Sequence, residues 1–145
     1  MFKKFSFWIW GAIILQWLTA ATHAVGQILG DSAEVTDEKE KQLMDLMVNF
    51  KKDYGAGMVR SLNDFVFALG ICLTLFCVFG GLVDWWLNRK KIAADVWRGL
   101  LAIQLVIYAI VFVTVFLYTF IIPIVCFGLI LLFTFGAYMS TPKRA

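Results

Sequence analysis

Four stretches of apolar residues, each long enough to cross a bilayer, dominate the pattern along the chain. The first runs from about Phe7 to Leu29 and the second from about Leu62 to Leu87, and two more occupy about 98–120 and 123–139. A helix needs about 20 apolar residues to cross the roughly 30 Å hydrocarbon core of a membrane. The pattern therefore predicts an all-α integral membrane protein, a four-helix transmembrane bundle in a single membrane domain, residues 1–145.

The last two spans share one apolar stretch of about 40 residues without a charged side chain, about twice the length of one crossing. Pro123 lies near its middle. Proline lacks the N–H that a helix interior uses and disfavours helix at the preceding residue. We therefore predict a tight turn at Phe120 to Pro123 between a third and a fourth helix. A single long, kinked helix is the alternative.

The only long polar segment, Gly30 to Ser61, predicts an outer loop that contains one amphipathic helix. Apolar residues recur there at helical spacing, and acidic residues come early while Lys51 and Lys52 come late, as suits the helix dipole. The apolar positions are Leu43, Met44, Leu46, Met47 and Phe50. Such a helix is expected to lie on the bundle or in the membrane interface. Gly55 and Gly57 should end it.

The first apolar stretch also fits a secretory signal peptide. Lys3 and Lys4 precede it, and Thr22-His23-Ala24 resembles a cleavage site. Apolar character continues past that site through Val25 and Ile28 and completes a membrane length. We expect a retained helix, and a cleaved signal is the alternative.

Composition agrees with a membrane protein, because 61% of the residues are hydrophobic and mean hydropathy is +0.82. The formal net charge of +3 comes from scattered residues. A nucleic-acid-binding protein would carry a basic stripe on one face, so no nucleic-acid partner is expected. Three cysteines, all inside predicted spans and without a CxxC motif, predict apolar packing and no disulfide framework.

Charge predicts the topology, since Lys and Arg concentrate in short cytoplasmic segments. With both termini inside, eight basic and two acidic residues are cytoplasmic, a sum of +6, and five basic and eight acidic residues are outside, a sum of −3. The cytoplasmic set is Lys3, Lys4, Asp84, Arg89, Lys90, Lys91, Asp95, Arg98, Lys143 and Arg144. The acidic outer residues are Asp31, Glu34, Asp37, Glu38, Glu40, Asp45, Asp53 and Asp64. Only an even number of crossings after Lys91 keeps every cytoplasmic segment basic.

Polar residues inside the spans are the candidate site, because polar groups in a membrane are costly. Gln16, His23 and Gln27 share one face of the first helix. Near the outer end of the second helix, Asp64 could pair with His23, and the alternative is a capping box that starts at Ser61. Tyr108 and Thr114 of the third helix complete a candidate ligand pocket, with packing as the alternative for Tyr108.

Other positions in the spans predict close helix packing. On the second helix, small or polar residues recur at spacings of four and three, a packing face. They are Asn63, Phe67, Gly70, Thr74, Cys77, Gly81 and Asp84. Gly128 and Gly136 are expected to be close-approach points on the fourth helix.

No acidic residue is expected at mid-bilayer, which argues against a proton-coupled pump built on a membrane-embedded glutamate. The chain has no HExxH, GxSxG or Walker-type motif, which disfavours an enzyme.

Three segments carry a resemblance to a known family. They are Leu18–Gln27, Asn49-Phe50-Lys51 and Arg60–Phe65. The chain resembles a family of uncharacterised small four-helix bacterial membrane proteins over about its first 85 residues. That family has His-x-x-Gly-His in the first helix and Ser-x-x-Asp with an aromatic at the start of the second. Here His23, Gly26, Ser61, Asp64 and Phe65 match, but Gln27 replaces the second histidine. The resemblance implies a bacterial origin and a role for His23 and Asp64, and no activity.

Two classes of function remain. The first is an accessory or interaction protein of the bacterial inner membrane, with cytoplasmic termini and an outer-loop helix that contacts a partner. Membrane lipid, a membrane-protein partner or a second copy are the expected contacts. The second class binds a small ligand, a quinone or haem in an outer-half pocket, although a lone histidine without a Cys or Glu cluster disfavours a metal. Its residues are His23, Gln27, Asp64, Tyr108 and Thr114. We favour the first class.

Overall fold

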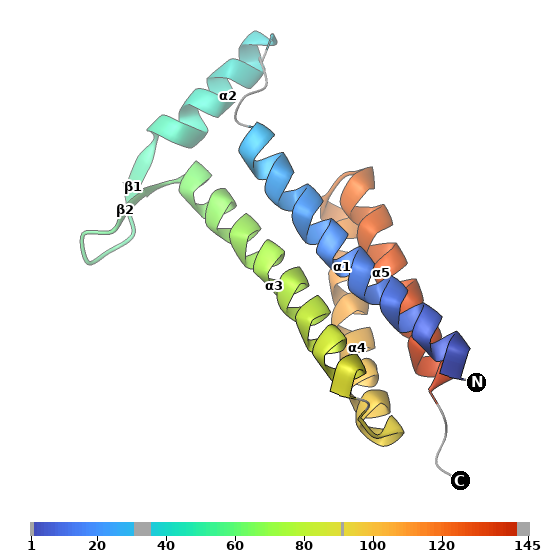
Figure 1. The fold of residues 1–145 in the computed structure, drawn as a ribbon. Helices are drawn as coiled ribbons and strands as arrows, with labels where there is room; N and C mark the ends of the chain where they lie inside the picture. Colours follow the sequence, from blue (N-terminus) through green and yellow to red (C-terminus); the bar gives the residue numbers. More distant parts are fainter. Residues whose placement is uncertain (1, 31–35, 91, 142–145) are drawn as a thin grey trace. The chain divides into compact units, whose positions relative to one another are not determined.

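The computed structural model describes residues 2–30, 36–90 and 92–141 and consists mainly of helices. The elements in order are α1 (Phe2–Gly30), α2 (Glu38–Asn49), β1 (Lys51–Asp53), β2 (Val59–Ser61), α3 (Leu62–Lys90), α4 (Ala94–Tyr118) and α5 (Ile121–Ser140) (Figure 1). Four helices, α1, α3, α4 and α5, are long and apolar enough to cross a membrane. The predicted all-α class with four membrane helices is therefore confirmed.

The chain divides into two compact units, 1–19 with 77–145, and 20–76. We call them the core unit and the loop unit and describe each by itself. Several charges used in the topology argument lie outside the described residues. They are Asp31, Glu34, Lys91, Lys143 and Arg144.

The core unit has a buried apolar centre built by α1, α4 and α5. Its fully buried members include Ile9 and Ile13 of α1 and Leu101 of α4. Two glycines let large rings approach the backbone closely. A Cβ at Gly11 would overlap the Phe133 ring, and a Cβ at Gly136 would overlap Trp8. The rings of Trp8 and Phe133 in turn meet edge to face with centroids 5.2 Å apart. Glycine therefore sets the contact between α1 and α5, as small residues do in membrane bundles.

The long apolar stretch at the C-terminus forms two helices, and the turn comes slightly earlier than predicted. Tyr118 ends α4, and α5 begins at Ile121. The Thr119 hydroxyl donates to the Val115 carbonyl at 2.6 Å and closes the last turn of α4. Pro123 therefore lies inside the first turn of α5. The first four N–H groups of a helix have no partner within it, so a proline there costs no hydrogen bond.

In the loop unit, α2 is shorter than the sequence predicted and is followed by a hairpin. Asp37 caps its start by accepting from the N–H groups of Lys39 and Glu40. The helix ends at Asn49, so Lys51 and Lys52 belong to β1 and not to the last helical turn. The placement of these two lysines near the helix dipole was therefore wrong.

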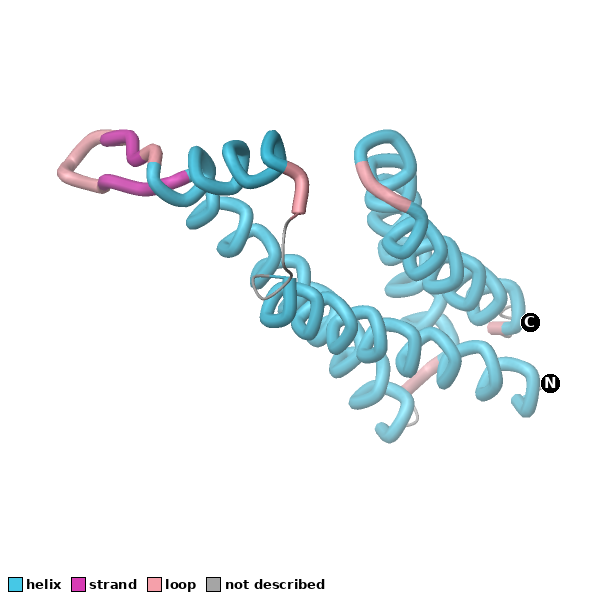
Figure 2. Tube along the Cα trace, turned by 90° about the horizontal axis from the view of Figure 1, so that it is seen from above, coloured by secondary structure: helices cyan, strands magenta, loops and turns pink. Residues whose placement is uncertain are grey.

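The hairpin pairs Lys51 with Ser61 and Asp53 with Val59, and its two strands are magenta in Figure 2. Gly55, Ala56 and Gly57 all have positive φ, so glycine is needed at two of the three turn positions. The hairpin leads directly into α3, which begins at Leu62. A strand pair of only three residues each leaves too weak a periodic pattern to predict from sequence.

Candidate functional site

Four buried polar side chains form a hydrogen-bonded group in the core unit, and we call it the Asp84 cluster: Gln16, Asp84, Gln104 and Tyr108. Gln16 Nε2 donates to Asp84 Oδ2 at 3.0 Å, and Gln104 Nε2 donates to Asp84 Oδ1 at 2.8 Å. The Tyr108 hydroxyl donates to Gln16 Oε1 at 2.8 Å. The cluster therefore ties together α1, α3 and α4 through side chains alone.

Three members of the cluster lie in the middle of their spans. Gln16 lies at the midpoint of the Lys4–Leu29 span, and Gln104 and Tyr108 lie on either side of the midpoint of α4, one turn apart. Asp84 is only six residues from the end of α3 at Lys90, yet it bonds to these central side chains. Asp84 is therefore buried inside the bundle, although its place near Lys90 had put it among the cytoplasmic charges.

Gly80, one turn before Asp84 on α3, makes room for the cluster. A Cβ at this position would overlap Gln16 Oε1 and would lie 2.7 Å from the Tyr108 hydroxyl oxygen. Any side chain larger than hydrogen would therefore displace the bond between these two groups. On the next residue, a Cβ at Gly81 would overlap the Trp17 indole. Gly81 belongs to the predicted packing face of α3 and makes a close contact, whereas Phe67 of the same face is 49% exposed.

The charge of Asp84 has no basic partner in the described part of the chain. Its two carboxylate oxygens accept from two neutral carboxamides, and the side chain is fully buried. Gln104 Oε1 is also buried and has no hydrogen-bond partner. A buried ion costs several kcal/mol unless it is paired and hydrogen-bonded. The cluster is thus well bonded but electrically uncompensated.

The predicted pair of His23 and Asp64 belongs to the loop unit, where the structure shows the alternative for Asp64. Asp64 Oδ2 accepts from the Ser61 N–H at 2.8 Å, and the Asp64 N–H donates to Ser61 Oγ at 3.2 Å. This reciprocal pair is a capping box at the start of α3. His23 Nε2 is buried and has no hydrogen-bond partner. Asp64 therefore stabilises a helix end.

The other predicted site residues have separate surroundings. Gln27 Nε2 donates to the Phe67 carbonyl at 3.2 Å and fills the space that Gly70 leaves open. Tyr108 belongs to the Asp84 cluster, and the exposed Thr114 bonds the Ile110 carbonyl of its own helix at 2.9 Å. Two of the residues predicted to line a pocket, Gln27 and Thr114, therefore use their side chains to bond backbone carbonyls.

The sequence pattern singled out Gln16 and Tyr108 as candidate-site residues and Asp84 as part of the packing face of the second helix, but did not join them. Gln16 was placed on the polar face of the first helix, and Gln104 and Tyr108 are four residues apart in the third span. Asp84 was counted among the cytoplasmic charges, together with the basic residues that follow it. One signal in the sequence could have joined them. Each of three spans carries polar side chains, and polar side chains inside a membrane are expected to hydrogen-bond one another in the interior of the bundle.

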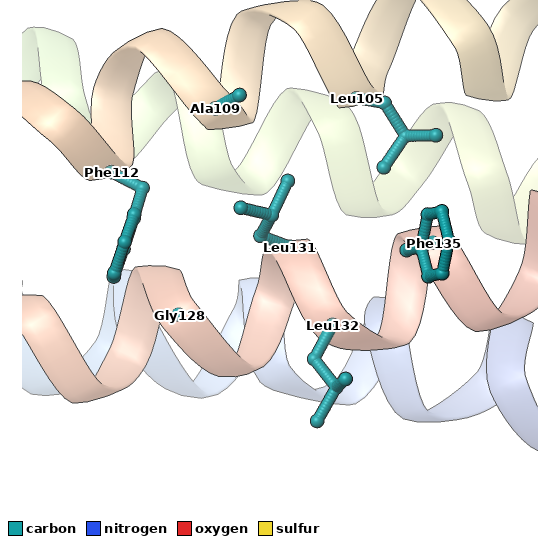
Figure 3. A pocket seen from close by; sticks show the side chains of 7 residues that line it. All are labelled: Leu105, Ala109, Phe112, Gly128, Leu131, Leu132 and Phe135. Carbon is teal, nitrogen blue, oxygen red and sulfur yellow. The ribbon is translucent and has the colours of Figure 1, made fainter.

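A second feature of the core unit is an apolar groove of about 490 Å³ between α4 and α5. Leu105, Ala109, Phe112, Gly128, Leu131, Leu132 and Phe135 line it (Figure 3). The Phe112 ring extends toward Gly128, where an added Cβ would lie 3.2 Å from it. Gly128 is therefore a close-approach point, as predicted. The groove offers no polar side chain to orient a ligand.

Comparisons with known proteins add no assignment, because no protein-family model, curated protein or solved structure matches this chain. Within the described residues, no group of three or more His, Cys, Asp or Glu side chains is arranged to hold a metal ion.

Proposed function

We propose that this chain is an accessory protein of a bacterial inner membrane, and that its outer-loop helix α2 binds another membrane protein. The observation that carries the proposal is that α2 has no buried residue although it has an apolar face. Leu43, Leu46 and Phe50 are 57%, 60% and 66% exposed. An apolar face that the chain itself leaves uncovered is typical of an interaction surface.

The charge of α2 favours a protein over the lipid surface as its partner. Helices that lie on membranes usually carry Lys and Arg on their polar face. Between Glu38 and Asn49, α2 has three acidic and two basic residues, a net charge of −1. It also ends without a basic residue in its last turn. This charge gives no attraction to anionic lipid.

The proposed orientation places both termini in the cytoplasm and α2 outside. The support is the charge difference along the sequence, +7 for the inner segments (eight basic residues and Asp95, without the buried Asp84) against −3 for the outer ones. The resemblance to small four-helix bacterial membrane proteins supports the assignment to a bacterial inner membrane.

Site-specific photo-crosslinking tests the proposed partner. A photoreactive residue is placed at Leu43 on the apolar face of α2, and a matched one at Lys41, which is also exposed. Two residues of α-helix rotate by about 200°, so the two probes point in nearly opposite directions. In native membranes, Leu43 should give one discrete adduct with another protein, and Lys41 should not. A Leu46→Glu substitution should weaken that adduct.

Three results would contradict the proposal. Adducts of equal strength from both positions would indicate random collision. Adducts with lipid alone would make α2 an interfacial helix. Adducts only with a second copy of the chain would replace the accessory role with self-association.

A ligand-binding protein is the second candidate, and one observation favours it. His23 Nε2 is buried without a hydrogen-bond partner, so it could bond a quinone carbonyl or ligate haem. Purified protein in detergent should then carry a chromophore or an extractable quinone that His23→Ala loses. A colourless preparation free of metal and quinone would eliminate this candidate and leave the first.

A further inference from the structure

The Asp84 carboxylate is buried and is hydrogen-bonded by neutral groups alone in the described part of the chain. Both oxygens are fully buried, and within the described residues their donors are the carboxamides of Gln16 and Gln104. Neither carboxamide carries a charge. Membrane-embedded carboxylates without a basic partner require another source of positive charge, or the desolvation cost stays uncompensated.

Gln104 also has a buried carboxamide oxygen, Oε1, without a hydrogen-bond partner. Gln104 is 8% exposed, and its Oε1 lies on the same carboxamide whose Nε2 donates to Asp84 Oδ1. A carboxamide has nearly the same shape after a half-turn about its last bond, with a donor exchanged for an acceptor. The half-turn would therefore present an acceptor to Asp84 at the place where a donor now lies.

The titratable groups around Asp84 are few. On α4, Tyr108 lies within electrostatic range of Asp84. On α3 itself, Cys77 precedes Asp84, and the cations Arg89 and Lys90 follow it in the last turn, where they lie over the rings of Trp85 and Trp86. On α5, Cys126 lies within electrostatic range of Cys77, and the group of α1 that bonds Asp84 in the described residues is the neutral Gln16. Within the described residues the two donors to Asp84 are neutral carboxamides, and the cations of α3 lie over indole rings instead of bonding the carboxylate.

We propose that Asp84 is a proton-binding site inside the membrane, with Gln104 as the group that adapts to the proton. When the carboxylate binds one proton at Oδ1, the Gln104 carboxamide turns and the new O–H donates to Gln104 Oε1. When the proton leaves, Gln104 Nε2 again donates to Oδ1. The bond from Gln16 to Oδ2 persists in both states, so the number of hydrogen bonds on Asp84 is two in each. This inference does not depend on a partner for α2.

Infrared difference spectroscopy of the full chain in lipid nanodiscs tests the proposal. Spectra are recorded as pH falls from about 9 to about 6, a range that stays above the usual pKa of exposed Asp and Glu, about 3.9 and 4.3. The wild type should gain the C=O stretch of a protonated carboxylic acid, and Asp84→Asn should lack it. Gln104→Leu should keep the band at a shifted frequency, because the O–H loses its acceptor. Asp45→Asn, which removes an exposed carboxyl from α2, should leave the band unchanged.

Two outcomes overturn the proposal. The first is identical difference spectra for the wild type and Asp84→Asn, which would mean that Asp84 binds no proton in this range. The second is loss of the band on adding sodium ions at constant pH, which would identify a metal cation as the ligand. If Asp84→Asn fails to fold, Gln104→Leu decides, because a band with unshifted frequency in that variant contradicts the role of Gln104.

Discussion

Replacement of Gly80 by alanine is the sharpest test of the packing around the Asp84 cluster. The added methyl group would overlap Gln16 Oε1 and lie 2.7 Å from the Tyr108 hydroxyl oxygen, so these two groups would have to separate. Their hydrogen bond contributes about 1 kcal/mol net. Forcing an extra carbon into a filled site costs a further 1 to 3 kcal/mol, roughly. The free energy of unfolding should therefore fall by about 2 to 4 kcal/mol before any gain in helix propensity.

Gly99→Ala is the matched control, because nothing lies within 4 Å of the position where its Cβ would be built. Gly80 and Gly99 are both in helices, so the gain in helix propensity of about 1 kcal/mol is common to both substitutions and cancels in their comparison. Reversible unfolding in mixed detergent micelles measures both. The two variants should differ by about 2 to 4 kcal/mol, roughly 30-fold or more in the unfolding equilibrium. Equal stability would refute the geometry of the cluster.

Three smaller predictions concern the ends of elements. Ser61→Ala should cost about 1 kcal/mol, because the N–H of Asp64 loses its cap, and amide exchange in the first turn of α3 should accelerate about fivefold; unchanged exchange would contradict the capping box. Pro123→Ala should change the unfolding free energy by less than about 0.5 kcal/mol, and a large change would place the turn elsewhere. Gly57→Ala should destabilise the hairpin by about 1 kcal/mol, because its φ is +74°, and slower amide exchange at Met58 would argue against this conformation.

The spans were predictable because membrane helices have a strong signal in sequence. Uninterrupted apolar length and basic connectors suffice to count them, and Pro123 indicated that the last stretch is two helices. The turn itself falls at Thr119 and Phe120, because a proline is compatible with the first turn of a helix as well as with the preceding loop. A proline therefore indicates where one helix ends and the next begins only to within about one helical turn.

The Asp84 cluster was not predictable from spacing, because its bonds depend on the offset between helices. Asp84 lies near the end of α3, where an acidic residue next to Trp85 suggests the membrane surface. Its partners Gln16 and Gln104 lie at the middle of their spans. By contrast, the capping role of Asp64 is local, since Ser61 is three residues away, and the motif indicated it directly.

The most direct test of the central claim, four crossings with both termini on the cytoplasmic side, is accessibility labelling of two engineered cysteines. In a chain whose native cysteines are replaced by alanine, one cysteine is placed at Ala56 in the hairpin and one at Asn88 near the end of α3. An impermeant thiol reagent should label position 56 in intact cells and position 88 only after the membrane is permeabilised. Labelling of position 88 from outside intact cells, or labelling of both positions alike, would contradict it.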